Sequence, residues 1–173
     1  MSNLRKWPDH LFTGNATHWI SDKALVFCKG DGIDFGAGKW CLPGAIPVDH
    51  STYFGLEDFD PNSLDFVYSS HCLEHIRNWK TLLSELVSKL KPNGIIFLYL
   101  PHAISPWTGW RKHKWTPDAE TVIVALEELG VDLLTHSMLP DAYQSFFVVG
   151  KKQKTSSQDI WETNKTNGIA FKR

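Results

Sequence analysis

The sequence predicts an α/β fold in which helices cover a mainly parallel β-sheet. Residues 32–150 alternate short apolar runs typical of buried strands with longer segments of helical periodicity, a pattern typical of strand–helix–strand units. Two of the apolar runs end in a carboxylate residue, Asp34 and Asp49. A length of 173 residues, 42% of them hydrophobic, suffices for one domain with a substantial core. We therefore expect a single α/β domain over residues 1–150.

The N-terminal part is predicted to hold an arm, a helix and a strand that ends in a glycine turn. Residues 1–15 show no periodicity and are interpreted as a loosely packed arm, whereas residues 16–29 have the apolar content of a helix. Residues 33–35 are interpreted as the end of a buried strand. Gly36 and Gly38 follow, and without a Cβ atom they let the backbone turn sharply and approach a ligand.

The next apolar run, residues 45–48, is short and contains Pro47. Proline is tolerated mainly on edge strands or at the first residue of a strand, because it cannot donate to the hydrogen-bond ladder. We therefore expect this strand at the edge of the sheet. Asp49 follows it directly, where its carboxylate could accept hydrogen bonds from two ribose hydroxyls.

The second half of the domain is predicted to supply two helices and the remaining strands. Apolar residues repeat at helical spacing between Asn78, a candidate N-cap, and Pro92. Thr116 and Pro117 fit the cap and the first position of a further helix, which Gly130 ends. The strands expected in this half are residues 64–70, 95–101, 133–138 and 143–150.

Charge and composition argue against several classes of function. The formal net charge of -1 offers no long-range attraction for a phosphate backbone, which argues against a nucleic acid partner. No segment approaches the roughly 18 apolar residues needed to span a bilayer, and the first residues lack the apolar core of a signal peptide. Cys28, Cys41 and Cys72 form an odd, unspaced set and are predicted to be free thiols. We expect a cytoplasmic protein without a membrane partner.

The C-terminal segment differs in composition from the domain before it. Residues 151–173 are rich in Lys, Ser, Thr, Gln and Asn, with sparse apolar residues. Such a segment cannot bury enough apolar surface to offset the entropy of ordering it. We predict that it forms a polar, solvated tail.

Four groups of residues occur in a fixed order within roughly residues 31–150. An acidic residue and a Gly-x-Gly turn end the first strand, and another acidic residue ends the second. A polar turn and a strand then lead into Leu-Glu-His, and a helix ends in Leu-Lys-Pro-x-Gly before a strand that ends in proline. The residues are Asp34 with Gly36, Ala37 and Gly38, then Asp49, then Leu73 to His75, then Leu90 to Gly94 with Pro101. In this order they resemble the class I S-adenosylmethionine-dependent methyltransferases.

This resemblance implies a fold, a cofactor and an activity. The fold would be a Rossmann-like three-layer sandwich, with a mainly parallel sheet that ends in a C-terminal antiparallel strand. The cofactor would be S-adenosyl-L-methionine, and the activity would be transfer of its methyl group. The acceptor implied by the resemblance is a small molecule or a glycan precursor.

Two departures from the family indicate a shortened member. The family has a full helix between the glycine turn and the ribose carboxylate, whereas residues 39–45 are too few for one and contain Pro43. The Leu-Pro-Gly before the second strand resembles a subgroup with members associated with sugar or polysaccharide modification. Residues 50–58 leave no clear place for the family's third strand or for the acidic residue that binds the adenine amino group. Glu57 and Asp58 are the nearby substitutes for that residue. We expect the first crossover helix and the third strand to be shortened or missing.

The resemblance also implies the cofactor site. Asp34 would face the ammonium group of the cofactor and Asp49 its ribose. The candidate cofactor-binding residues are Asp34, Gly36, Ala37, Gly38, Asp49, His50, Ser69, Ser70 and His71. A nicotinamide cofactor fits less well, because the third glycine of its fingerprint is replaced by Cys41 and no helix follows the turn to bind a pyrophosphate.

The acceptor side is predicted from the segments after the fourth and fifth strands of the family. Methyl transfer needs alignment of the acceptor and, for a hydroxyl, removal of a proton. The candidate catalytic bases are His71, His102 and His113, although each could be a polar loop residue. Residues 101–115 also contain three tryptophans, which could stack on a sugar or flat acceptor or only plug the end of the sheet.

Other chemistries were weighed against methyl transfer. His71-Cys-Leu-Glu-His75 fits the His-x-x-Glu-His pattern of inverted zinc peptidases, but that pattern needs a helix and here it follows a strand, so we expect no metal. Ser69-Ser-His-Cys lacks the motifs of DNA methyltransferases. A second class of function stays open, a non-catalytic module that binds S-adenosylmethionine or S-adenosylhomocysteine without transferring the methyl group.

Overall fold

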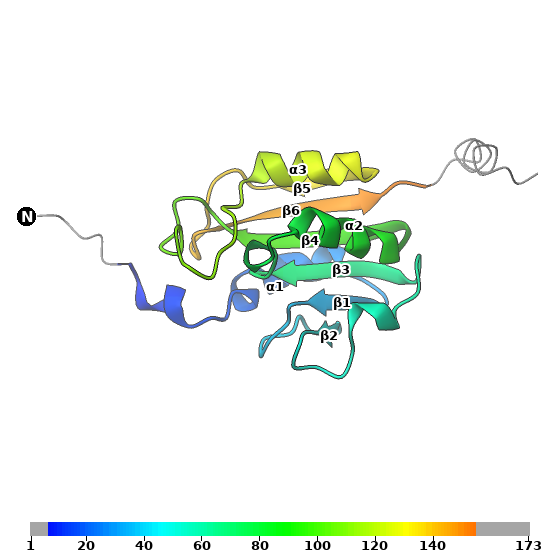
Figure 1. The fold of residues 1–173 in the computed structure, drawn as a ribbon, viewed down its shortest axis with the longest axis horizontal. Helices are drawn as coiled ribbons and strands as arrows, with labels where there is room; N and C mark the ends of the chain where they lie inside the picture. Colours follow the sequence, from blue (N-terminus) through cyan, green and yellow to red (C-terminus); the bar gives the residue numbers. More distant parts are fainter. Residues whose placement is uncertain (1–6, 155–173) are drawn as a thin grey trace, which may run out of the picture.

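The computed structural model describes residues 7–154, and the predicted tail is outside this range apart from residues 151–154. The described chain forms a six-stranded sheet with helices on both faces (Figure 1). Its strands are β1 Gly32–Phe35, β2 Ile46–Val48, β3 Leu64–Ser70, β4 Leu90–Pro101, β5 Val131–His136 and β6 Ser145–Lys152. Its α-helices are α1 Thr17–Phe27, α2 Trp79–Lys89 and α3 Ala119–Glu128, and its short 3₁₀ turns are η1 Asp9–Phe12, η2 Leu56–Asp58 and η3 Leu73–His75.

The strand order is β2-β1-β3-β4-β6-β5. The neighbours among β1, β2, β3 and β4 pair in parallel, whereas β6 runs antiparallel to both β4 and β5. The predicted α/β fold, a mainly parallel sheet with a C-terminal antiparallel strand, is confirmed. Since parallel strands end at the same edge, the segments after β1, β3 and β4 meet there.

Two separate apolar clusters hold the three layers together. Along β3, side chains alternate between the faces, so Val67 packs with α2 and α3, while Phe66 and Tyr68 pack with α1. Figure 1 shows α2 and α3 on one face of the sheet and α1 on the other. The central strands are buried on both faces, which explains why they contain nearly continuous apolar runs.

The shortening predicted from the sequence is present. Within residues 7–154, no helix lies between β1 and β2, and β2 is the edge strand, as Pro47 predicts. A single parallel bridge between Val48 and Phe54 is the only pairing on the outer side of β2 among the described residues. The sheet therefore ends where the related fold continues into a third strand.

Two local expectations need correction. Leu11, in the segment interpreted as a loose arm, is 1% exposed and packs with α1, because η1 folds this part of the arm onto the body. The last helix does not begin at Thr116 and Pro117. Its N-cap is Asp118, whose carboxylate accepts a hydrogen bond from Thr121 N–H (2.8 Å), which satisfies one of the unpaired backbone donors of the first helical turn.

The predicted helix after Asn78 is confirmed, and Cys28, Cys41 and Cys72 are not joined to one another. Across residues 7–154, none of the helices has both the length and the apolar character that a membrane crossing requires. The C-terminal strand β6 extends to Lys152, and the remainder of the predicted tail, residues 155–173, is outside the described part of the chain.

Candidate functional site

Two cavities adjoin each other at the carboxyl edge of the parallel strands. The smaller, about 360 Å³, is lined by the glycine turn after β1, by Ser70 at the end of β3 and by the segment before α1. The larger, about 480 Å³, is lined mainly by aromatic and histidine side chains and by one glutamate. Gly14, Ala16 and His71 line both cavities. His71 therefore lies at the boundary between the two.

The glycine turn needs its glycines for two different reasons. Gly36 has φ +81, and a Cβ atom there would lie 2.3 Å from Cys72 Sγ, so the close approach is to the protein itself. Gly38 has φ +51, and a Cβ atom there would meet no protein atom within 4 Å. Ala37 and Gly38 both line the smaller cavity. This part of the turn has the open space that a ligand needs.

Asp34 is buried under the same turn. It is 1% exposed, and its Oδ2 accepts a hydrogen bond from Leu42 N–H (2.7 Å). Its Oδ1 has no hydrogen-bond partner that meets normal geometry among the described residues, although the Cys41 thiol lies close by. Burial raises the pKa of Asp34 to about 7, because removing the carboxylate from water disfavours its charge. A buried carboxyl of this kind favours a cationic partner.

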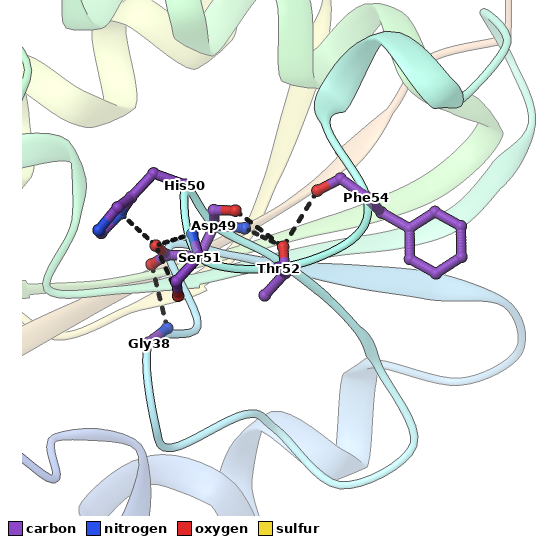
Figure 2. Close-up of polar contacts among 6 residues, drawn as sticks. All are labelled: Gly38, Asp49, His50, Ser51, Thr52 and Phe54. Carbon is purple, nitrogen blue, oxygen red and sulfur yellow. Dashed lines mark hydrogen bonds and ion pairs between the residues drawn. The ribbon is translucent and has the colours of Figure 1, made fainter.

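Asp49 fastens the turn to the end of β2 (Figure 2). Its Oδ2 accepts a hydrogen bond from Gly38 N–H (3.1 Å), and its Oδ1 accepts one from Ser51 N–H (3.3 Å). His50 Nδ1 contacts the same Oδ1, while the His50 side chain is 94% exposed. The Thr52 hydroxyl accepts a hydrogen bond from the backbone N–H of Asp49 (2.8 Å). Asp49 thus has a structural role, and its ribose role stays a prediction.

The predicted polar residues at the end of β3 have different positions. Ser69 is buried, and its hydroxyl donates to the Phe35 carbonyl (2.8 Å), which ties β3 to β1. Ser70 lines the smaller cavity. His71 follows in the left-handed region, with φ 50. This conformation is uncommon for a residue with a side chain, and it places His71 between the cavities.

His71 is held in one protonation state by its surroundings. Its Nε2 lies 2.7 Å from Ser145 Oγ, and that hydroxyl donates onward to the Tyr143 carbonyl (3.0 Å). Ser145 must therefore accept a hydrogen from Nε2, which leaves the lone pair of His71 on Nδ1. Burial lowers the pKa of His71 to about 3. The ring is neutral at neutral pH and packs edge-on against Trp107, with 5.2 Å between the two ring centroids.

The larger cavity contains a residue that the sequence analysis did not assign to the site. Glu74 is 0% exposed, and neither of its carboxyl oxygens has a hydrogen-bond partner among the described residues. Burial raises the pKa of Glu74 to about 8 and lowers the pKa of neighbouring His113 to about 4. The Leu-Glu-His motif contains Glu74, but it contributed only to the family resemblance and indicated no role for this residue. Tyr143, in the β5–β6 connection, also lines this cavity.

The predicted catalytic histidines and the tryptophan segment are divided among several positions. His71 and His113 line the larger cavity together with Trp107 and Trp110. His102 lies outside both large cavities, where its Nδ1 accepts a hydrogen bond from Ile104 N–H (3.2 Å). Trp115 stacks on Trp79 at 4.1 Å. Two tryptophans therefore line the cavity, and the third packs within the fold.

Comparison with known proteins supports a common fold. An Archaeoglobus fulgidus S-adenosylmethionine-dependent methyltransferase is 19% identical, with a TM-score of 0.59, and the match covers 78% of this chain and 94% of that one. Burkholderia thailandensis 1,6-didemethyltoxoflavin-N1-methyltransferase, solved with 1,6-didemethyltoxoflavin and S-adenosylhomocysteine, is 14% identical, with a TM-score of 0.60, covering 84% and 82%. Haemonchus contortus phosphoethanolamine N-methyltransferase 2, solved with S-adenosyl-L-methionine, is 16% identical, with a TM-score of 0.59, covering 84% and 56%.

The sequence comparison identifies the family. A search of the curated proteins finds no match. Residues 13–136, which include the glycine turn, both carboxylates and the Leu-Glu-His motif, match the family described as methyltransferase domain. This match covers more than half of the chain. The protein therefore belongs to the methyltransferase domain family.

Proposed function

We propose that this protein transfers a methyl group from S-adenosyl-L-methionine to a small-molecule or saccharide-like acceptor. The observation that carries the proposal is the pair of adjoining cavities with His71 at their boundary. One cavity is built on the glycine turn, and the other is lined by aromatic side chains. Two substrates that exchange a group must bind next to each other with their reacting atoms aligned.

The smaller cavity fits the cofactor by its chemistry. Asp34 does not line this cavity, but its buried carboxyl lies directly before the turn that does, and a carboxyl without a cation suits the ammonium group of the cofactor. Gly38 leaves space for the ligand beside the turn, and Asp49 stands at the end of β2. Bound S-adenosyl-L-methionine would supply a methyl group already activated by its sulfonium. Ser70 of the predicted set lines the cavity, and the Ser69 hydroxyl bonds the Phe35 carbonyl beside it. The His50 side chain is exposed.

The larger cavity fits an acceptor of modest size. A volume of about 480 Å³ lies within the range of small-molecule sites, and such sites are mostly apolar with a few polar groups. Trp107 and Trp110 offer faces on which a sugar or a flat ring can stack. His71 and His113 present neutral imidazoles, the form that accepts a proton from a hydroxyl. The position of His102 outside the cavity favours these two histidines over it.

The proposal is tested by binding and transfer measured on the same protein. Calorimetry with S-adenosylmethionine and S-adenosylhomocysteine should show one site, and a labelled-methyl assay over hydroxyl and amine acceptors should show transfer. Absence of cofactor binding by the folded protein would contradict the proposal.

A non-catalytic binding module is the second candidate. It is favoured by the low pKa of both candidate bases in the larger cavity, about 3 for His71 and about 4 for His113, which makes each a weak general base. Tight cofactor binding without transfer to any member of a broad acceptor panel would support the module and contradict the enzyme. Transfer to even one acceptor, lost when the folded protein carries Asp34→Ala, would exclude the module.

A further inference from the structure

A compact cluster of metal-ligating groups lies beside the larger cavity. One ligand atom each from Glu74, His75 and His113 can be chosen so that all three lie within 4.8 Å of one another. Glu74 and His75 come from η3 after β3, whereas His113 comes from the segment after β4. All three residues line the cavity. The fold thus brings together two histidines and a carboxylate from separate segments.

The buried carboxyl of Glu74 is the group that most needs a partner. It is 0% exposed, and both oxygens lack a hydrogen bond among residues 7–154. Leaving such a group unpaired costs free energy, so buried carboxyls are normally hydrogen-bonded, paired or bound to a metal. The nearest titratable groups to Glu74 Oε1 are His75 Nε2 at 3.8 Å and His71 Nδ1 at 3.7 Å. Neither distance is a hydrogen bond.

The imidazole of His75 is oriented as a metal ligand would be. Its Nδ1 lies 3.3 Å from the Lys112 carbonyl, which can only accept, so Nδ1 carries the hydrogen. The lone pair of His75 is therefore on Nε2, the atom that faces Glu74. A hydrogen bond from the other ring nitrogen to a carbonyl is typical of histidines that bind metals, because it fixes the tautomer and the ring orientation.

The backbone fixes the third group relative to the other two. Lys114 N–H donates to the Glu74 carbonyl (2.7 Å), and His113 N–H donates to the Trp110 carbonyl (2.8 Å). His113 therefore lies at the end of a hydrogen-bonded turn and directly before Lys114, whose N–H is bonded to η3. Its ring centroid lies 4.9 Å from that of His75. The close approach of His113 thus rests on backbone hydrogen bonds as well as on its side chain.

We propose that Glu74, His75 and His113 bind a divalent transition-metal ion, with Zn²⁺ as the best fit. Two imidazoles and one carboxylate form a ligand set that Zn²⁺ accepts, and three protein ligands leave a position open toward the cavity. The set is distinct from the His-x-x-Glu-His pattern of inverted zinc peptidases, because it uses His113 in place of His71. It departs from the expectation of no metal, because no sequence pattern places His113 beside Glu74. With the ion bound, His71 is the remaining candidate base for the proposed transfer.

The proposal is tested by metal binding to the full, untagged protein after treatment with a chelator. Calorimetry with Zn²⁺ should show one equivalent bound, and Co²⁺ should give the visible absorption of a four-coordinate site. His113→Ala and Glu74→Gln should each weaken Zn²⁺ binding by more than about 100-fold, because each removes a direct ligand and loss of groups that only orient the ligands already costs about 10- to 100-fold. His102→Ala, a histidine of the same segment outside the cluster, is the matched control and should bind Zn²⁺ normally.

Two outcomes would overturn the proposal. One is the absence of a stoichiometric Zn²⁺ site in the folded wild-type protein. The other is a site that survives both His113→Ala and Glu74→Gln, which would place the ion elsewhere. Circular dichroism of the metal-free variants shows that they are folded, and Zn²⁺ should raise the melting temperature of the wild type but not of His113→Ala. These readouts do not depend on methyl transfer, so the proposed function can fail while the metal site stands.

Discussion

The two adjoining cavities are built in different ways. The smaller one is built mainly on one contiguous stretch, the turn after β1, which backbone N–H groups at Gly38 and Leu42 tie to the carboxylates of Asp49 and Asp34. The larger one draws residues from η1, η3, the segment after β4 and the β5–β6 connection, and its carboxyl at Glu74 has no hydrogen-bond partner among the described residues. A contiguous motif can be recognised in a sequence, whereas an assembled site needs the fold.

The largest expected effect concerns the two tryptophans of the larger cavity, whose loss should impair methyl transfer and leave cofactor binding nearly unchanged. Replacing Trp107 and Trp110 with alanine should lower methyl transfer by at least about 100-fold, because a misplaced acceptor loses the alignment on which the displacement depends. Cofactor affinity should stay within a few-fold, since neither tryptophan lines the smaller cavity. Labelled-methyl transfer and calorimetry on the same preparation measure the two effects.

Controls for this pair address folding. Trp107 is 8% exposed, so its loss also costs packing, whereas Trp110 is 53% exposed and Trp110→Ala should leave stability nearly unchanged. Leu126→Ala, a buried change on α3 away from both cavities, causes a packing loss on a comparable scale and should retain transfer. Loss of cofactor binding in a folded Trp107 and Trp110 variant would show that the two cavities are one site.

A second prediction concerns the pH dependence of stability at Asp34. Its pKa is about 7 in the folded protein against 3.8 for the ordinary group, because burial disfavours the charge. The folded state thus binds the proton more tightly, and this contribution to stability is present at low pH and lost as the pH rises toward about 7. Between about pH 5 and pH 7 the wild type should lose about 2 to 3 kcal/mol from this group.

The Asp34→Asn variant should lack this loss, since it has no charge to bury. Urea denaturation of both proteins at several pH values measures the difference. The neighbouring groups Asp49 and Cys41 are unchanged in the variant, so their contributions cancel in the comparison. Parallel stability curves for the two proteins would show that Asp34 is not the buried titrating group described here.

The smallest expected effect tests the ribose role of Asp49. Asp49→Ala should weaken S-adenosylhomocysteine binding by about 1 to 3 kcal/mol, the cost of leaving hydrogen-bonding groups unpaired. Part of this cost comes from the turn, because the carboxylate also holds Gly38 N–H. Ser51→Ala, which removes only one hydroxyl contact of Asp49, serves as the control. Unchanged affinity in folded Asp49→Ala would contradict a ribose role.

The sheet could be predicted because the burial of each strand and its position in the sheet determine which residues it can contain. Strands buried on both faces need nearly continuous apolar runs, and Pro47 is compatible with few positions other than an edge. The start of α3 was misplaced because Thr116 and Asp118 are both good N-caps, and only the observed bond to Thr121 distinguishes them. The packing of Leu11 was not predicted because Pro8 and Gly14 interrupt the arm, so that its few apolar residues do not form a helical pattern.

The candidate site could be predicted most fully where its residues follow the ends of strands. Asp34, Gly38 and Asp49 come together at strand ends that follow one another along the chain. The approach of His113 to Glu74 depends on a backbone hydrogen bond between segments about 40 residues apart, and long-range pairing of this kind has no local signal in the sequence. For the same reason nothing in the sequence separated His102 from His113.

The position of Pro47 also bears on self-association. The Val48 carbonyl accepts a hydrogen bond from Gly36 N–H, so the backbone of Val48 faces β1 and, by alternation along the strand, that of Pro47 faces outward. An exposed edge is a template on which another chain can add a strand, and proline removes the donor that such pairing requires. The loss of a third strand could have left an aggregation-prone edge. Pro47 removes the backbone donor at the centre of this edge, beside the Val48–Phe54 bridge, and so disfavours the addition of a further strand there.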